Sequence, residues 1–357
     1  SCGTSAAAGA TATTSRPPRA EAVPGPPVLA LTQGDPAGVG PEVVFAALSS
    51  LAPGGALPLL VVEEAAVTAI RHLVPPALRE RLRWLAEPPS REEIARLAPA
   101  IPVVDPVRRP RRVVPGRSGP EDAHGALAAL DLGIALARAG TVDALVTAPV
   151  SKASIAAHCR PDFVGHTDYL AAACGLGSYG RDYLMAFLAP GLRVALLTVH
   201  QPLAEAVAAL DGESVGAALA CLWRHGGGGR IAVAGLNPHA GEGGLLGREE
   251  EEILAPAVAA ARGRGIDVYG PESADSLFAR ARQGEFDWVL ALYHDQGLIA
   301  VKTAAFGRAT NWTLGLPFLR TSVDHGTAFA LAGTGRADAA PMAAVLATTL
   351  ELLATRA

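Results

Sequence analysis

Lysine and asparagine are the residues that this sequence almost lacks. Of the 30 lysines and arginines only Lys152 and Lys302 are lysines, and Asn237 and Asn311 are the only asparagines. Arginine therefore supplies nearly every cation, and a retained lysine is expected to do what a guanidinium cannot, such as donating from a compact ammonium or shifting its pKa. We predict that both lysines belong to a functional site, the alternative being chance retention.

The sequence also has few aromatic residues and no excess of positive charge, and each of these facts excludes some classes of protein. Aromatics make up 5% of the chain, which favours layers of helices and parallel strands over an aromatic-rich β-sandwich. The net charge is −4, and the arginines at 108–112 have no interleaved aromatics, so no nucleic-acid partner is expected. No apolar run approaches the roughly 20 residues of a membrane span, so no membrane partner is expected either.

The cysteines lack the CxxC spacing of metal or redox motifs. Cys2, Cys159, Cys174 and Cys221 lie in unrelated contexts, which predicts reduced thiols in a cytoplasmic protein. Residues 1–27 are rich in Ala, Thr, Ser, Pro and Gly and have no continuous apolar segment. We expect a disordered N-terminal extension there rather than a signal peptide.

What the sequence does have is a regular alternation of short apolar runs and helical patterns. Its 357 residues allow two domains or one large α/β unit. Alternation of this kind predicts an α/β fold with parallel sheets covered on both faces. The expected strands are 28–32, 58–62, 143–147, 193–199, 230–236 and 288–292, and the expected helices are 65–73, 121–139, 249–262 and 341–353.

The first strand is followed by the loop GDPAGVGPE, residues 34–42. Pro41 suits the first turn of a helix. The exposed backbone N–H groups of such a loop can hold an anion, but a tight strand-to-helix turn has the same composition. The spacing matches neither GxGxxG nor a P-loop, so both interpretations stay open.

Three of the apolar runs are each followed by a histidine, namely His200, His239 and His294. One such histidine is more often structural, but three at strand ends favour a divalent metal, because imidazole is a common ligand for zinc and similar ions. Three protein ligands with an open position are typical of a catalytic metal. Four other histidines in helical or loop contexts are assigned to surface or core, namely His72, His124, His158 and His225.

Two further motifs place polar residues after predicted strands. Lys152 ends TAPVSK, and Lys302 follows a turn expected at Gly297. In GHTDYL we predict Thr167 as a helix N-cap with His166 just outside the helix. A capping turn with a surface histidine is the alternative.

The segment 305–338 is rich in Gly, Thr and Asp and is judged too polar for a core, so it is expected to form part of a site. Arg320 follows an apolar stretch within it, where a guanidinium is suited to clamp a phosphate or a carboxylate. A surface salt bridge is the competing interpretation of Arg320.

Taken together, these motifs resemble the 4-hydroxythreonine-4-phosphate dehydrogenase family of vitamin B6 biosynthesis. The resemblance runs from residue 28 to the C-terminus, through GDPAGVGPE, TAPVSK, GHTDYL, TVHQPL, NPHAGEGG, GREEEE, YHDQGL and GLPFLRTSVDHGTAFALAGTGRAD. A weaker likeness, in DHGTAFALAGTGRADAAPM, extends to the isocitrate and isopropylmalate dehydrogenases, in which a similar loop holds the adenosine of the cofactor.

The resemblance implies a fold of two α/β/α domains around a cleft, similar to isocitrate and isopropylmalate dehydrogenases, and a homodimer with the active site near the subunit interface. We place the first domain at 28–145 with 310–357 and the second at 146–309. The implied cofactors are NAD or NADP and one divalent ion such as zinc, magnesium or cobalt. The implied reaction oxidises 4-phosphohydroxythreonine to a 3-oxo acid, which decarboxylates to 3-amino-2-oxopropyl phosphate.

The resemblance also assigns roles to individual residues. The metal ligands would be His200, His239 and His294, and the substrate would be held by His166, Thr167, Lys302, Asn311 and Arg320. The cofactor would contact the loop of Asp324, His325, Gly326 and Thr327. Catalytic candidates are Lys302, Lys152 and Asp295, although Asp295 is also placed to orient its neighbouring histidine.

Three alternatives remain open at this stage. A sister group with the same motifs oxidises 4-phosphoerythronate or 4-phosphothreonate. Three histidines with an open position also activate water in metal hydrolases, but a hydrolase does not account for the His-Gly loop near the C-terminus. A non-catalytic protein that binds a phosphorylated metabolite is the third alternative.

Overall fold

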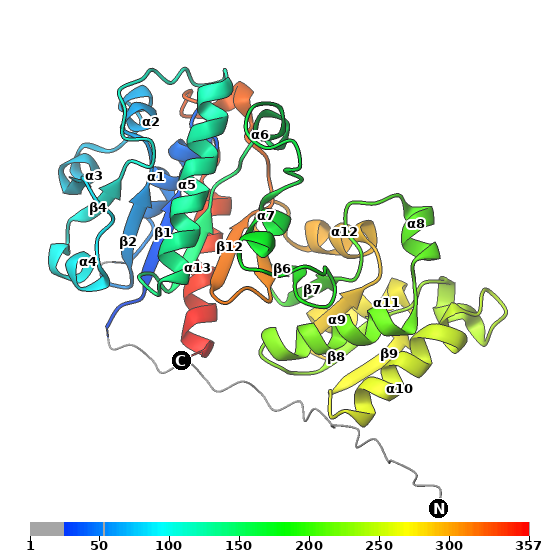
Figure 1. The fold of residues 1–357 in the computed structure, drawn as a ribbon. Coiled ribbons are helices and arrows are strands. Elements are labelled where there is room, and N and C mark those ends of the chain that lie inside the picture. The colour runs from blue at the N-terminus through cyan, green and yellow to red at the C-terminus, as the bar shows by residue number, and fades with distance from the viewer. Residues whose placement is uncertain (1–24, 53, 357) are drawn as a thin grey trace, which may run out of the picture.

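The computed structural model of the chain describes residues 25–52 and 54–356, so the expected N-terminal extension and Cys2 lie outside the described residues, apart from residues 25–27. One continuous sheet of twelve strands runs through the molecule (Figure 1). The strands are β1 (Val28–Thr32), β2 (Leu57–Val61), β3 (Leu82–Leu85), β4 (Ile101–Val104), β5 (Ala144–Thr147), β6 (Leu184–Ala189), β7 (Leu192–Leu196), β8 (Ile231–Ala234), β9 (Val268–Glu272), β10 (Trp288–Ala291), β11 (Thr310–Leu314) and β12 (Leu319–Val323).

Helices connect these strands. They are α1 (Gly40–Leu48), α2 (Glu64–Ala69), α3 (Pro76–Arg81), α4 (Arg91–Leu97), α5 (Pro120–Arg138), α6 (Lys152–His158), α7 (His166–Ala173), α8 (Leu203–Ala208), α9 (Gly212–His225), α10 (Ala255–Gly263), α11 (Ala274–Arg282), α12 (His294–Ala305) and α13 (Ala340–Arg356), with the short helices η1 (Pro238–Glu242), η2 (Glu250–Leu254) and η3 (Phe329–Leu331). Within the described part of the chain, no helix is long and apolar enough to cross a membrane.

The strand order is β3-β4-β2-β1-β5-β12-β11-β6-β7-β10-β8-β9. The first six strands in this order are parallel, and so are the last four, but the pairs β12–β11, β11–β6 and β6–β7 are antiparallel. The expected α/β class is confirmed, while the expectation of purely parallel pairing is wrong at the centre. There β6 and the neighbouring β11 join the two lobes seen in Figure 1. The division of the chain into domains stays a prediction.

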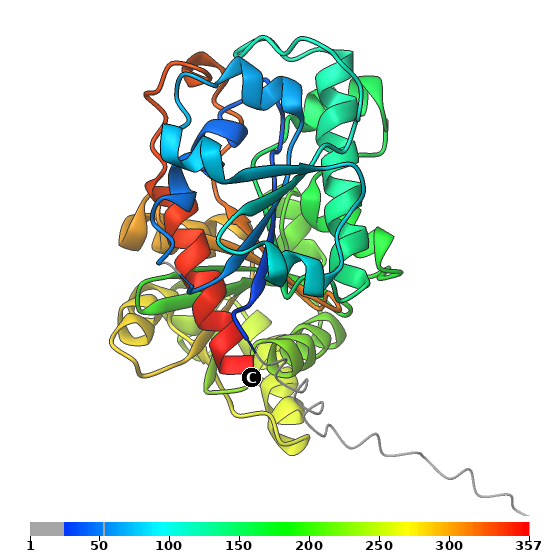
Figure 2. The ribbon, with the colours of Figure 1, turned by 90° about the vertical axis from the view of Figure 1, so that its left-hand side faces the viewer.

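Each lobe is layered because its central strands are apolar on both faces. In β1, Leu29 and Leu31 pack into one core cluster together with α1 and α13, whereas Val28 and Ala30 pack into another with α5. Successive side chains of a strand point to opposite faces, so one strand supplies both cores. Figure 2 shows the result, with α13 and α5 on opposite sides of the strands.

The turn predicted at Gly297 is wrong, because Gly297 lies inside α12. A Cβ atom at this position would lie 2.6 Å from Leu196 Cδ2 and 2.9 Å from Val194 Cγ1. The glycine is therefore required by the close approach of α12 to β7, not by a change of chain direction. Lys302 consequently projects from the last turns of this helix.

Candidate active site

A cavity of about 270 Å³ lies over one face of the central strands. Asn311 of β11 is paired with Ser322 of β12 on one side and with Phe187 of β6 on the other, and Ser322 is also paired with Thr147 of β5. Residues paired in this way share a face of the sheet. The floor of the cavity is thus a row of side chains from four strands, to which Arg320 adds a guanidinium.

The opposite face of the same strands packs against α13, where Thr321 Oγ1 and Thr349 Oγ1 lie 2.7 Å apart. Every residue of β12 is buried. The judgement that 305–338 is too polar for a core is therefore wrong for this strand. Its alternating residues are divided between a buried contact with α13, made by Thr321, and the pocket floor, to which Arg320 and Ser322 belong.

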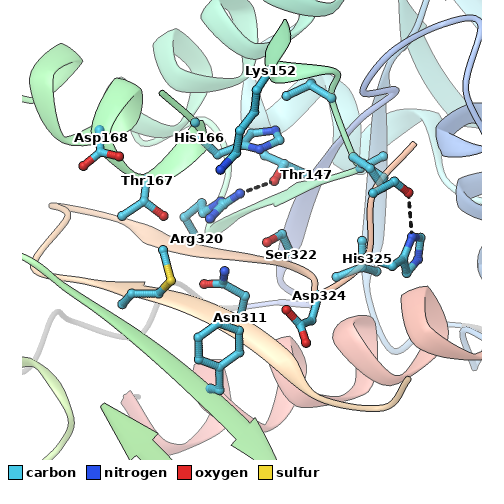
Figure 3. Close-up of a pocket in the computed structure, with 18 of the residues that line it drawn as sticks. Thr147, Lys152, His166, Thr167, Asp168, Asn311, Arg320, Ser322, Asp324 and His325 are labelled. Atoms are coloured by element: carbon cyan, nitrogen blue, oxygen red, sulfur yellow. Dashed lines mark hydrogen bonds between the residues drawn. The ribbon is translucent and has the colours of Figure 1, made fainter. Parts of the chain in front are cut away.

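Arg320 is the most unusual group in the pocket (Figure 3). It is 1% exposed. Its two terminal nitrogens donate to Thr313 Oγ1 at 3.1 Å and to Thr147 Oγ1 at 2.6 Å, and Nε has no partner. No carboxylate of the described residues pairs with it. The surface salt bridge considered for Arg320 is therefore wrong.

Burial lowers the pKa of Arg320 to about 9, so the group stays protonated at neutral pH. A buried charge without a counter-ion costs several kcal/mol. A protein retains such a charge where an anionic ligand supplies the missing partner, and a guanidinium fork suits phosphate and carboxylate.

The wall next to Arg320 is the start of α7. The helix begins at His166 with Gly165 as its N-cap, so the predicted capping role of Thr167 is wrong. Thr167 instead is buried and lines the pocket with His166. A Cβ on Gly165 would lie 3.0 Å from Lys152 Cε, so the absent side chain leaves the path by which Lys152 reaches this wall.

Three buried polar atoms of this pocket have no hydrogen-bond partner: Arg320 Nε, His166 Nε2 and Asn311 Oδ1. Burial, followed by the charges of Arg320 and Lys152, lowers the pKa of His166 well below its usual value, so the imidazole is neutral. Orphaned buried polar atoms are rare in proteins. Here they converge on one cavity, which indicates that the cavity binds a polar, anionic ligand.

The far end of the pocket is formed by His200, in the loop after β7, and His294, the first residue of α12. Their ring centres lie 5.6 Å apart. Burial, with the charges of Lys152 and His294, lowers the pKa of His200. His294 Nδ1 lies 2.7 Å from Asp295 Oδ1, an arrangement in which the carboxylate orients the ring and leaves Nε2 for a ligand.

His239 does not line this pocket. No three His, Cys, Asp or Glu side chains among residues 25–52 and 54–356 lie close enough to hold a metal ion. The structure therefore brings together two of the three predicted ligands, and the complete set of ligands stays a prediction.

The loop of His239 is a strained turn, and the carboxylate of the buried Glu250 holds the backbone that leads into it. His239, Ala240 and Glu242 all have positive φ values, of 52°, 51° and 46°, a conformation that is costly for residues other than glycine. Glu250, 3% exposed, accepts bonds from the backbone N–H groups of Leu236 and Asn237 and from Asn237 Nδ2, at 2.7–2.9 Å. The rare Asn237 thus has a positioning role.

Replacing Glu250 with alanine is expected to lower the free energy of unfolding by about 2–4 kcal/mol, because three donors lose their buried acceptor. Urea denaturation followed by circular dichroism measures the change. The matched control is Glu251→Ala, since Glu251 is exposed and should alter stability little. Equal stability of the two variants would show that Glu250 does not hold this loop.

Lys302 and the predicted cofactor loop meet at Asp324. Lys302 Nζ lies 3.3 Å from Asp324 Oδ2. Asp324, His325 and Gly326 line the pocket, whereas Lys302 does not. Thr327 is not among the residues that line the pocket, and its backbone oxygen accepts a hydrogen bond from Val39 N. One end of the proposed cofactor loop is therefore joined to the loop that follows β1.

That loop is a tight turn and not an anion site. The backbone N–H groups of Asp35, Ala37, Gly38 and Val39 are already bonded, to Pro149 O, Asp35 Oδ1, Asp35 O and Thr327 O respectively. A Cβ on Gly34 would lie 2.2 Å from Pro149 O, so the turn requires glycine there. Of the two interpretations of GDPAGVGPE, the strand-to-helix turn is confirmed.

The arrangement corresponds to a family of known proteins. Residues 58–349 match the family model described as pyridoxal phosphate biosynthetic protein PdxA. The chain belongs to the PdxA family. The expected family is thereby confirmed, and the resemblance inferred from the motifs holds over most of the chain.

Individual relatives support this assignment. The chain is 42% identical to 4-hydroxythreonine-4-phosphate dehydrogenase of Acidithiobacillus ferrooxidans over 339 residues, which cover 92% of this chain and 97% of the relative. It is 39% identical to D-threonate 4-phosphate dehydrogenase of Salmonella typhimurium, over 91% of this chain and 98% of the relative. The crystal structure of 4-hydroxythreonine-4-phosphate dehydrogenase from Klebsiella pneumoniae superposes with a TM-score of 0.78 at 34% identity, covering 92% and 99% of the two chains.

Several pocket residues were not selected from the sequence, among them Thr147, Asp168, Thr313 and Ser322. Asp168, Ser322 and Thr147 line the cavity, and Thr313 bonds Arg320. A signal for two of them exists in the alternation of TNWTL and LRTSV, which is typical of two strands with one polar face. No strands were predicted there because the segment 305–338 was expected to form part of a site and to be too polar for a core.

Proposed function

We propose that this cavity is the active site of an NAD(P)-dependent and divalent-metal-dependent dehydrogenase that oxidises the secondary alcohol of 4-phosphohydroxythreonine, in pyridoxal phosphate biosynthesis. The proposal is supported most directly by the buried, uncompensated guanidinium of Arg320 with its orphaned Nε. Membership of the PdxA family indicates the class of enzyme, and the unpaired positive charge in the pocket supports a phosphorylated substrate.

Arg320, His166, Thr167 and Asn311 would bind the phosphate end of the substrate. The guanidinium offers an unused Nε–H, and the neutral imidazole of His166 offers an unused Nε2 that donates in one tautomer. The first backbone N–H groups of α7 add a positive partial charge at the same wall. The charge of a phosphate would balance the buried cation that the protein alone leaves uncompensated.

A divalent ion fits the imidazole pair, because His200 is held unprotonated by burial and His294 is oriented by Asp295. A metal ion held there would supply charge stabilisation for an alkoxide at the substrate hydroxyl, and a bound nicotinamide would supply the hydride acceptor. We propose zinc, magnesium or cobalt for this ion, and NAD or NADP along the loop of Asp324, His325, Gly326 and Thr327.

Among the three catalytic candidates, the geometry favours Lys152 as the group that moves a proton at the reacting oxygen, because its side chain lines the cavity. Asp295 orients His294. Lys302 holds Asp324 at 3.3 Å and would act on the substrate from the rim. The 3-oxo acid formed would lose carbon dioxide to give 3-amino-2-oxopropyl phosphate.

We further propose a cytoplasmic homodimer. Within one chain His239 stays apart from His200 and His294, so a third histidine ligand at the pair has to come from a rearranged loop or from a second subunit. A dimer with its active site near the interface meets this need. Sedimentation of the full chain tests the assembly independently of the activity.

The sister reaction on a 4-phosphorylated hydroxy acid is a specific alternative, because the relative named D-threonate 4-phosphate dehydrogenase is nearly as similar as the others. Formation of reduced nicotinamide decides between the two. We expect kcat/KM to be highest for 4-phosphohydroxythreonine when it is compared with 4-phosphoerythronate and 4-phosphothreonate. No nicotinamide reduction with any of the three would refute the proposed function.

A further inference from the structure

Asp168 contributes a carboxylate to the pocket in which Arg320 is proposed to bind the substrate phosphate. It is the third residue of α7 and lines the cavity. Among the described residues it forms no ion pair, and its side chain accepts one hydrogen bond, from Tyr183 Oη to Oδ1 at 3.0 Å. Asp324, the other carboxylate of the cavity, is neutralised by Lys302. Asp168 is therefore the acidic group left for a ligand.

Asp168 also lies on a different side of Thr167 from Arg320, as Figure 3 shows. The imidazoles of His200 and His294 line the same cavity as Asp168, and so does the ammonium side chain of Lys152. The carboxylate thus lies away from Arg320 in a cavity that it shares with the imidazole pair.

The carboxylate is held by a buried tyrosine, which packs against a partly buried one. Tyr183 is 6% exposed, and its ring lies 5.4 Å from that of Tyr179, edge to face. Tyr179 Oη in turn donates to Leu196 O at 2.8 Å. Since both tyrosines are fixed to the central strands, the direction of the Asp168 carboxylate is set before a ligand binds.

The proposed substrate has a phosphate on C4, a hydroxyl on C3 and an ammonium on C2. With the phosphate at Arg320 and the C3 hydroxyl toward the histidine pair, C2 would lie away from Arg320, in the part of the pocket that Asp168 lines. In 4-phosphoerythronate and 4-phosphothreonate a neutral hydroxyl takes the place of the ammonium. A carboxylate forms a much stronger charge-assisted bond with an ammonium than a bond with a hydroxyl.

We propose that Asp168 is a specificity-determining residue whose carboxylate binds the C2 ammonium and selects the amino acid substrate over the hydroxy acids. Tyr183 is the positioning residue that directs this carboxylate. The inference rests on the proposed function and extends it, because it assigns the choice between the two substrate classes to one side chain.

The test compares kcat and KM for 4-phosphohydroxythreonine and 4-phosphoerythronate in the full-length, metal-loaded enzyme. Asp168→Asn is expected to lower kcat/KM for the amino acid about tenfold to hundredfold, mainly through KM, the usual range for a lost bond to a charged group. For the hydroxy acid the expected change is within about threefold, since no charge is left unpaired. Tyr183→Phe should shift the same ratio in the same direction by a smaller factor.

Asp162→Asn is the matched control, because Asp162 lies in the same region and its side chain is 72% exposed; both kcat/KM values should be unchanged. If Asp168→Asn fails to fold, Tyr183→Phe still tests the ratio. Equal losses on both substrates, an unchanged ratio in both variants, or a wild-type preference for the hydroxy acid would each overturn the proposal. A wild-type enzyme inactive on both acids would instead refute the proposed function.

Discussion

Replacing Arg320 by methionine is expected to lower kcat/KM for the phosphorylated substrate by about 10²- to 10³-fold or more, because a buried charge pair with the phosphate is lost. Stability should move in the opposite direction. The buried guanidinium has no counter-ion in the protein, and replacing such a charge by an apolar side chain of similar volume is neutral or stabilising. Steady-state kinetics and urea denaturation of the same preparation measure both effects.

Arg320→Lys separates charge from shape. A lysine keeps the positive charge but lacks the planar fork that reaches Thr147 and Thr313, so most of the loss in kcat/KM should persist. Arg112→Met serves as the control, since Arg112 is exposed and both kinetics and stability should stay as in the wild type. An Arg320→Met enzyme with normal kcat/KM and reduced stability would show that the guanidinium is a structural group only.

Replacing His294 by alanine is the second change with a large expected effect. Loss of one ligand of a catalytic metal is expected to raise the activation free energy by about 4 kcal/mol, which lowers kcat/KM about 10³-fold. The amount of metal bound per chain should also fall. Asp295→Asn should cost about 10- to 100-fold, because the imidazole keeps its place but loses the carboxylate that orients it. Metal analysis after gel filtration, alongside kinetics, measures both variants.

His72→Ala is a suitable control for His294, because the ring of His72 bonds Gly333 O, outside the pocket, and metal content should not change. A metal content in His294→Ala equal to that of the wild type would remove His294 from the set of ligands. The same analysis on His239→Ala asks whether the third predicted histidine belongs to the set, which one chain by itself leaves undecided.

The fold class and three strands of the first lobe, β1, β2 and β5, could be predicted from sequence, because each lies in a continuous apolar run. Val28–Thr32 and the helix Pro120–Arg138 lie within a residue of the predicted bounds. The central strands β11 and β12 were not predicted, because the polar segment 305–338 was expected to form part of a site and not a core. Their burial depends on tertiary partners, such as Thr349 of α13, that no local pattern reveals.

The site shows the same division. The unusual status of Arg320 could be suspected from the sequence, but its burial and the absence of an acid partner are properties of the packed strands. Rarity singled out Lys152 and Lys302 together, yet only Lys152 lines the cavity. Lys302 is paired with Asp324. The scarcity of lysine therefore pointed to the part of the chain that forms the site. Only the structure distinguishes Lys152, which lines the cavity, from Lys302, which pairs with Asp324.

The central claim is that the pocket recognises a phosphate through Arg320 and oxidises the alcohol attached to it. The most direct measurement is the rate of nicotinamide reduction with 4-phosphohydroxythreonine and with 4-hydroxythreonine, which lacks the phosphate, for wild type and Arg320→Met. We expect a large preference for the phosphorylated compound in the wild type, and its near loss in the variant. An equal preference in both enzymes would contradict the account, because the phosphate would then be recognised elsewhere.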